Sequence, residues 1–246
     1  MIDGVKIDVP VFLASVKTPE EARLALANGA DVIDCKDPQK GALGALSAPA
    51  VQAIVEAIGG RALVSATAGD LPSDPGVMVK AATLIAAAGV DFVKAGFFGD
   101  ADPRDAIAAL GKAALGRARL VAVLMADRNP DFEILAALRA AGFAGVMLDT
   151  ADKSGGALPD VMPVKSLSRF IDAARQHGLS AGLAGSLRLE HIAGIAALGP
   201  DVIGFRGALC DGGRTGALDA ARIAAVRTAI DATSLRKRHA AKRIVA

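Results

Sequence analysis

The stretch Ala30-Asp31-Val32-Ile33-Asp34-Cys35-Lys36 joins a short apolar run to a lysine, and it follows a helix-like segment, Pro19–Gly29. Its apolar residues favour a buried strand. The glycine that precedes it is a common residue at the end of a helix. The stretch therefore indicates a helix followed by a buried strand whose last residue is charged.

The same unit recurs along the whole chain. Apolar runs alternate with helix-like segments, and the runs are continuous, as in strands that are covered on both faces. The expected strands are Val11–Val16, Ala30–Lys36, Ala62–Ala68, Val90–Gly96, Arg119–Ala126, Phe143–Thr150, Leu179–Ser186 and Asp201–Arg206. The expected helices that end at glycine include Pro19–Gly29, Pro75–Gly89, Asp131–Gly142, Val164–Gly178 and Leu187–Gly199.

Eight such units in 246 residues predict an α/β protein of the (β/α)8 TIM-barrel class. A doubly wound open sheet is the alternative, but it usually carries a Gly-rich dinucleotide motif after the first strand, where this chain has Lys17-Thr18-Pro19. No linker divides the chain. We therefore expect a single domain over residues 1–246, with a short N-terminal extension (1–10) and a basic C-terminal tail (234–246) that is a frayed, solvated end.

Composition narrows the function classes. Hydrophobic residues make up 52% of the chain and the formal net charge is +2, so the body of the chain has no electrostatic footprint for nucleic acid. No apolar run is long enough for a membrane span, and the N-terminus lacks a signal-peptide pattern. The two cysteines and three histidines show no disulfide or zinc spacing. We expect a cytoplasmic protein, a homo-oligomer of unknown symmetry, that binds a small phosphorylated molecule.

Charged residues near the ends of the even-numbered strands suggest a shared pocket. Chemistry in a TIM barrel lies at the carboxyl ends of the strands, and inward-pointing side chains of alternate strands share a layer. Lys36, Lys94, Asp149 and Arg206 belong to the second, fourth, sixth and eighth expected strands. Asp34 shares a face with Lys36 by strand periodicity. We expect these side chains around one pocket.

Such a cluster fits a nucleophilic amine. Two ammonium groups in one dry pocket destabilise each other's charged form, so one lysine can be neutral and attack a carbonyl. Lys153 follows Asp149 in a Ser-Gly-Gly loop and is expected to reach over the pocket. The alternative is purely structural, with Lys36–Asp34 and Lys94–Asp149 ion pairs that tie strand ends together.

Two later segments predict a phosphate site. The loops after strands seven and eight often bind phosphate in this fold, and here they contain Gly185-Ser186 and Arg206-Gly207. Glycine lets backbone N–H groups approach an anion, Ser186 can donate a hydrogen bond, and Arg206 can add charge. Cys210–Gly216 is expected to be a flexible loop that closes over the ligand. Thr67, on the third strand, is a further candidate for ligand binding.

The second strand and the loop after it resemble a known family signature. Asp34-Cys35-Lys36-Asp37-Pro38, followed by Gly41-Ala42-Leu43-Gly44-Ala45, is similar to the D-x-K-N-P…G-S-L-G-A motif of the (5-formylfuran-3-yl)methyl phosphate synthase family, also called 4-(hydroxymethyl)-2-furancarboxaldehyde-phosphate synthase. Further matches cover almost the whole chain in order, from Val11 to Ile230: Ser65–Asp70, Val93–Gly96, Met147–Lys153, Ala184–Ser186 and Arg206–Gly213. Asp37 departs from the pattern, where Asn is expected, and adds a negative charge beside Lys36.

The resemblance implies a (β/α)8 enzyme that condenses two molecules of glyceraldehyde 3-phosphate without a metal or organic cofactor. The furan phosphate product serves methanofuran-type one-carbon carriers, and one phosphate and two waters are lost. Lys36 is then the Schiff-base lysine and Lys94 the proton acceptor, while Asp34, Asp149 and Lys153 assist proton transfer and positioning. The alternatives are a class I aldolase or transaldolase-like enzyme and a non-catalytic barrel that binds a phosphometabolite.

Overall fold

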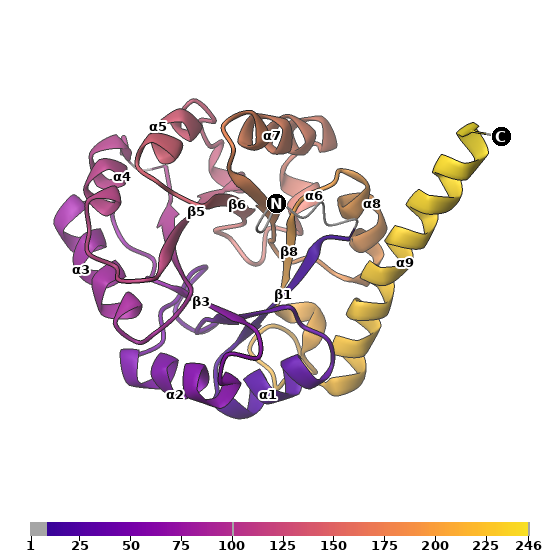
Figure 1. The fold of residues 1–246 in the computed structure, drawn as a ribbon, viewed down its shortest axis with the longest axis horizontal. Helices are drawn as coiled ribbons and strands as arrows, with labels where there is room; N and C mark the ends of the chain where they lie inside the picture. Colours follow the sequence, from indigo (N-terminus) through magenta and orange to yellow (C-terminus); the bar gives the residue numbers. More distant parts are fainter. Residues whose placement is uncertain (1–8, 100, 246) are drawn as a thin grey trace.

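The computed structural model describes residues 9–99 and 101–245. Its parallel strands pair in sequence order and close into a barrel, with β8 beside β1 (Figure 1). The strands are β1 (Val11–Val16), β2 (Val32–Cys35), β3 (Leu63–Thr67), β4 (Phe92–Phe97), β5 (Arg119–Met125), β6 (Gly145–Asp149), β7 (Ser180–Leu183) and β8 (Val202–Phe205). The predicted (β/α)8 barrel is confirmed.

Helices surround the barrel between successive strands (Figure 1). They are α1 (Pro19–Ala27), α2 (Ala48–Ile58), α3 (Pro75–Ala86), α4 (Arg104–Gly111), α5 (Ile134–Ala140), α6 (Leu158–Val161), α7 (Val164–Gln176), α8 (Ile192–Ala197) and α9 (Ala220–Val245). Short 3-10 turns lie at Ala126–Arg128, Leu189–His191 and Gly207–Leu209. Side-chain caps help to start three of the helices, with Thr18, Ser47 and Asp74 each accepting a backbone N–H.

The predicted segments differ most from the structure after β7 and at the C-terminus. The expected helix Leu187–Gly199 is shorter, because a 3-10 turn at Leu189–His191 precedes α8. The C-terminal tail is not frayed. It continues α9, which extends beyond the barrel in Figure 1, because the sequence from Ala220 to Val245 contains neither Gly nor Pro and is rich in Ala, Arg and Lys. The expected N-terminal extension falls mostly on residues 1–8, outside the described part.

The apolar core has two layers. The larger one lies between the strands and the helices and includes the fully buried Phe12, Phe143 and Phe170. A smaller cluster inside the barrel includes Leu13, Val123 and Met147. No helix among the described residues is long and apolar enough to cross a membrane. The inner cluster is sparse, so the upper barrel is free to hold charged side chains.

Candidate active site

The strand register places a carboxylate between two hydroxyls. Asp34 on β2 pairs with Ser15 on β1 and with Ser65 on β3. Its side chain is fully buried and accepts hydrogen bonds from Ser15 Oγ (2.9 Å) and Ser65 Oγ (2.6 Å). A buried carboxylate needs such partners to remain charged, and the two serines hold it in a fixed orientation.

Lys94 completes the environment of Asp34. It lies within β4, and its Nζ is 3.1 Å from each carboxylate oxygen of Asp34. The lysine is buried, with an exposed fraction of 4%. Asp34 therefore fixes the position of the Lys94 ammonium.

Asp149 joins two further lysines. Its Oδ2 is 3.2 Å from Lys36 Nζ, and its Oδ1 is 2.5 Å from Lys153 Nζ. The same Oδ1 accepts the backbone N–H of Thr150 at 2.8 Å, and Lys153 Nζ also contacts Thr150 Oγ1 at 3.2 Å. One carboxylate at the end of β6 thus bridges the lysine that follows β2 and the lysine of the β6–α6 loop.

The pKa values of Asp149 and of its partner Lys153 are both lowered. Burial alone would raise the pKa of Asp149, but the positive charges of Lys36 and Lys153 outweigh it and hold that pKa far below its ordinary value. The pKa of Lys153 is lowered, chiefly by burial and also by repulsion from Lys36, although Asp149 partly offsets both. Lys153 therefore gives up its proton more readily than an exposed lysine does.

The ion pairs differ from the structural alternative considered for the sequence. That alternative paired Lys36 with Asp34 and Lys94 with Asp149. In the structure, Lys36 pairs with Asp149 across the barrel mouth, and Lys94 pairs with Asp34. One pair joins the residue after β2 to the end of β6 and the other joins β4 to β2, and both lysines line the mouth cavity.

A cavity of about 450 Å³ opens above these pairs at the carboxyl ends of the strands. This volume lies in the usual range for small-molecule sites. The predicted site residues that line it are Lys36, Lys94, Asp149, Lys153, Gly185, Ser186, Arg206 and Gly207. Asp34 is not among the lining residues and contacts the lining residue Lys94. The structure thus brings together most of the predicted site residues, and their roles stay predictions.

Thr67 lies outside the cavity lining. It is fully buried, and its hydroxyl donates to the backbone carbonyl of Gly44 at 3.0 Å. Asp70, just beyond it, accepts the backbone N–H groups of Ala42 (2.8 Å) and Leu43 (2.6 Å). Thr67 therefore supports the β2–α2 loop in this structure and makes no contact with the cavity.

Asp37, the residue that departs from the family pattern, turns away from the lysine beside it. Its carboxylate pairs with Lys40 at 3.2 Å and accepts the backbone N–H of Gln39 at 3.0 Å. Burial would raise the pKa of Asp37, but these contacts keep it below the ordinary value. The additional negative charge is neutralised locally by Lys40, so Lys36 keeps Asp149 as its carboxylate partner.

The predicted phosphate loops have unusual backbone conformations. Gly185 has a φ of 111°, and a Cβ there would lie 2.9 Å from Thr150 Cγ2. Ser186 has a φ of 47°, in the left-handed region. Non-glycine residues in this region are uncommon and often mark functional sites. Across the cavity wall, a 3-10 turn begins at Gly207.

Arg206 is fully engaged within the protein. A guanidinium has five N–H donors. Those of Arg206 contact the carboxylate of Glu21 (2.5 and 3.2 Å) and the carbonyl oxygens of Ser15 (3.1 Å), Arg214 (3.0 Å) and Gly216 (2.8 Å). The predicted phosphate contact of Arg206 would have to displace one of these acceptors. The geometry favours a structural role, in which Arg206 folds the loop after β8.

Three residues of this site are not predicted from the sequence. Ser15 shares the Asp34 carboxylate, and Glu21 neutralises Arg206. Arg214, half-buried in the cavity wall, donates to the Gly41 carbonyl at 3.0 Å. The only available signal was position, because Ser15 lies near the end of β1 and Arg214 in the loop after β8.

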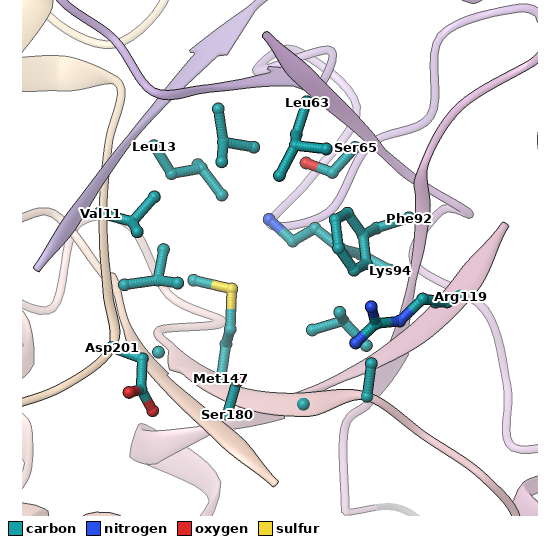
Figure 2. Close-up of a pocket in the computed structure, with 16 residues that line it drawn as sticks. Val11, Leu13, Leu63, Ser65, Phe92, Lys94, Arg119, Met147, Ser180 and Asp201 are labelled. Carbon is teal, nitrogen blue, oxygen red and sulfur yellow. The ribbon is translucent and has the colours of Figure 1, made fainter. Parts of the chain in front are cut away.

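A second cavity, of about 90 Å³, lies inside the barrel below the first. Figure 2 shows that Leu13, Phe92 and Met147 project into it, with Lys94 and Ser65 on one side and Arg119, Ser180 and Asp201 also around it. Its lining is mainly apolar. Leu13 and Lys94 line both cavities, so these two side chains separate the mouth of the barrel from its interior.

The two cysteines belong to the packed structure. Both are buried, and burial raises the pKa of each thiol. Among the described residues, no group of three or more His, Cys, Asp or Glu side chains is arranged to hold a metal ion.

Solved structures support the fold. The phosphoribosyl anthranilate isomerase of Thermotoga maritima matches with a TM-score of 0.66 at 15% identity, over 91% of this chain and 99% of its own. A 3-hexulose-6-phosphate synthase from Salmonella typhimurium matches with a TM-score of 0.63 at 20% identity, over 88% and 98%. At these identities the likeness concerns the fold alone.

Sequence relatives are more specific. A Methylorubrum extorquens protein, provisionally named as a (5-formylfuran-3-yl)methyl phosphate synthase, is 48% identical over 87% of this chain and 89% of its own length. The (5-formylfuran-3-yl)methyl phosphate synthase of Methanocaldococcus jannaschii is 36% identical over 82% and 91%. The family model described as 4-HFC-P synthase matches residues 12–227. The chain therefore belongs to the 4-HFC-P synthase family of enzymes.

Proposed function

We propose that this enzyme condenses two molecules of glyceraldehyde 3-phosphate into (5-formylfuran-3-yl)methyl phosphate, with release of one phosphate and two waters, through a Schiff base on Lys36. The observation that carries the proposal is the buried Lys36 amine, which lines the cavity and shares Asp149 with a second lysine. The names of the relatives support the same product.

The Asp149 bridge supports proton removal from Lys36. An amine must be neutral to attack a carbonyl. Lys153, whose pKa is lowered mainly by burial, is more readily neutral than an exposed lysine, and only a neutral amine can accept a proton. Asp149 contacts both amines and can pass a proton from Lys36 to a neutral Lys153. Lys36 then adds to the carbonyl of the ketone isomer of the substrate, and loss of water gives the imine.

Lys94 is suited to take protons from the imine. Its amine is held in place by Asp34 and its side chain lines the cavity, so it can act as the base once its ammonium has released a proton to solvent. Loss of a proton from the hydroxyl-bearing carbon beside the imine gives an enaminol, in which the double bond carries one hydroxyl and the Lys36 nitrogen. The hydroxyl then becomes a carbonyl and releases its proton, while the C–O bond to phosphate breaks and both of its electrons leave with phosphate. The second triose phosphate adds in an aldol step, and ring closure with dehydration gives the furan.

The mouth of the barrel also supports substrate binding. Gly185, Ser186 and Gly207 line the cavity and are the proposed site of the phosphate that the product retains. Lysine amines and backbone N–H groups are suitable partners for a phosphorylated carbonyl compound. No step requires a cofactor, because the protonated imine accepts electrons itself. We place the enzyme in the biosynthesis of methanofuran-type carriers.

Borohydride trapping tests the proposal. The enzyme is incubated with glyceraldehyde 3-phosphate alone, reduced, digested and analysed by peptide mass, and the solution is assayed for free phosphate and for a furan chromophore. We expect an adduct on Lys36, none on the exposed neighbour Lys40, and equal amounts of phosphate and furan. An adduct without released phosphate would indicate an aldolase instead. An unmodified Lys36 with an active Lys36→Ala variant would overturn the assignment.

A further inference from the structure

The cavity holds one guanidinium whose donors are largely unused. Its three lysines pair with Asp34 and Asp149, and Arg206 pairs with Glu21. Arg188 and Arg222 are exposed at the rim and pair with Glu190 and Asp211. For Arg214, the one hydrogen bond of the guanidinium to another described residue is to the Gly41 carbonyl at 3.0 Å. Four of its five N–H donors are therefore available to a ligand.

The backbone of Arg214 is held in place by the cluster around Arg206. The carbonyl of Arg214 accepts Arg206 Nε at 3.0 Å, and the carbonyl of Gly216 accepts Arg206 Nη2 at 2.8 Å. Backbone hydrogen bonds from Asp211 to Ala217 and from Gly216 to Gly213 close the same loop. The backbone of Arg214 is thus fixed and one end of its side chain is held at Gly41, which lowers the entropic cost of ordering it on a ligand.

The Arg214 guanidinium and the Gly185–Ser186 loop line different parts of the mouth. It comes from the loop after β8, but its guanidinium reaches across β1 to Gly41 in the β2–α2 loop, the loop that follows Lys36. Gly185 and Ser186 follow β7, on the other side of β8. The two positions can therefore serve two different anions at once.

The chemistry of the proposed reaction requires two anion positions, because two phosphorylated substrates meet and only one phosphate stays. We propose that Arg214 binds the phosphate that is eliminated from the substrate held on Lys36. This assignment rests on the proposed function. A guanidinium offers paired N–H groups that match phosphate oxygens. As the C–O bond breaks and its electrons leave with phosphate, Arg214 offsets the growing negative charge.

The first test measures binding without chemistry. Glycerol 3-phosphate carries phosphate but no carbonyl, so it cannot form an imine. By equilibrium dialysis, we expect two equivalents per chain for the wild type and one for Arg214→Gln. The matched control is Arg117→Gln, since Arg117 also donates to a glycine carbonyl (Gly89, 2.8 Å) but lies outside the cavity; it should retain two. A single equivalent in the wild type, or two in Arg214→Gln, overturns the proposal.

The second test separates imine formation from phosphate release. With glyceraldehyde 3-phosphate, Arg214→Gln should still give a borohydride adduct on Lys36, while phosphate release falls about 100-fold, as on removal of one anion-stabilising donor. Arg214→Lys should recover part of the rate. Loss of the adduct together with release would contradict this role. If the wild type releases no phosphate, the proposed function fails, yet the dialysis result still decides whether Arg214 forms an anion site.

Discussion

Asp34 is the most constrained side chain of the site, because two hydroxyls and one ammonium surround a carboxylate that has no contact with solvent. Each hydrogen bond to a charged group contributes about 1.5–3 kcal/mol to stability. Ser65, which does not line the mouth cavity, therefore acts on catalysis through Asp34 and Lys94 and not by touching the substrate.

Ser65→Ala should lower the free energy of unfolding by about 1.5–3 kcal/mol and should shift the pH dependence of kcat more than it changes KM. The shift is expected because Asp34 then orients Lys94 less firmly. Urea unfolding and a pH–rate profile check both parts. Ser180→Ala is the control, since Ser180 also lines the interior cavity but makes no side-chain hydrogen bond to another described residue. A pH profile identical to that of the wild type would reduce Ser65 to a purely structural residue.

The acidity of Asp149 makes stability depend on pH. Its pKa in the folded protein lies below the unfolded value of 3.8, so the unfolded chain binds a proton first as the pH falls. The stabilisation is therefore complete above about pH 5 and is lost as the pH falls below the unfolded pKa. The gap in Tm between the wild type and Asp149→Asn should be large near pH 7 and should shrink in acid.

Thermal unfolding across this pH range measures that gap. Asp172→Asn, which changes an exposed carboxylate on α7, should give a small and constant gap. A gap for Asp149→Asn that does not change with pH would show that the carboxylate contributes no charge interaction with Lys36 and Lys153.

Single residues also show where sequence reasoning succeeds. The position of Lys36 and Asp149 at the ends of even strands was enough to bring them to one mouth, because strand order in a barrel determines which side chains face each other. The sequence does not show which of the two arginines, Arg206 or Arg214, has N–H donors available for a phosphate. That depends on whether distant acceptors, such as Glu21 and the Ser15 carbonyl, already occupy the donors.

At the scale of elements, the Glu21–Arg206 pair joins α1 to the loop after β8. Breaking a buried ion pair by removing one charge costs about 3–5 kcal/mol, because the partner remains buried and uncompensated. Glu21 also accepts the backbone N–H of Lys17 at 2.9 Å. The pair therefore secures both the start of α1 and the loop that carries Arg214.

Glu21→Gln should lower the free energy of unfolding by about 3–5 kcal/mol and should weaken phosphate binding at Arg214 while Lys36 still forms its adduct. Its neighbour Glu20 is exposed and pairs with Arg23 at 3.5 Å, so Glu20→Gln should change stability by at most about 0.5 kcal/mol. Chemical denaturation compares the two. Equal changes in the free energy of unfolding would mean that the buried Glu21–Arg206 pair stabilises the protein no more than the exposed pair does.

Elements were predicted well where local chemistry decides them. Three helices start at the predicted residue, namely Pro19, Pro75 and Val164. Strand β1 has its predicted bounds, and β5 starts at its predicted first residue. Most strand ends were overestimated, as for β7, which was expected to reach Ser186 and ends at Leu183, but β4 continues one residue past its expected end, to Phe97. The long α9 was missed, since a basic composition suggested solvation, whereas high helix propensity governs the backbone.

At the scale of the whole molecule, closure of the barrel is what makes a pocket from scattered residues. Ser15 and Arg206 are far apart in sequence, but β1 and β8 are neighbours in the closed sheet. Sequence periodicity predicts the units, and the unit count predicts closure. The homo-oligomer and the cytoplasmic location stay predictions.

Leu13 and Lys94 alone are common to the linings of the two cavities, and this has a consequence for chemical rescue. Lys94→Ala should inactivate the enzyme and join the mouth to the barrel interior, leaving a slot shaped like the missing propylamine fragment. Added propylamine should fill it, donate to Asp34 and restore part of the rate in a saturable way. Tetramethylammonium, a cation of similar charge with no N–H, should not. A small amine from solution would then replace the base that Lys94 normally supplies from β4.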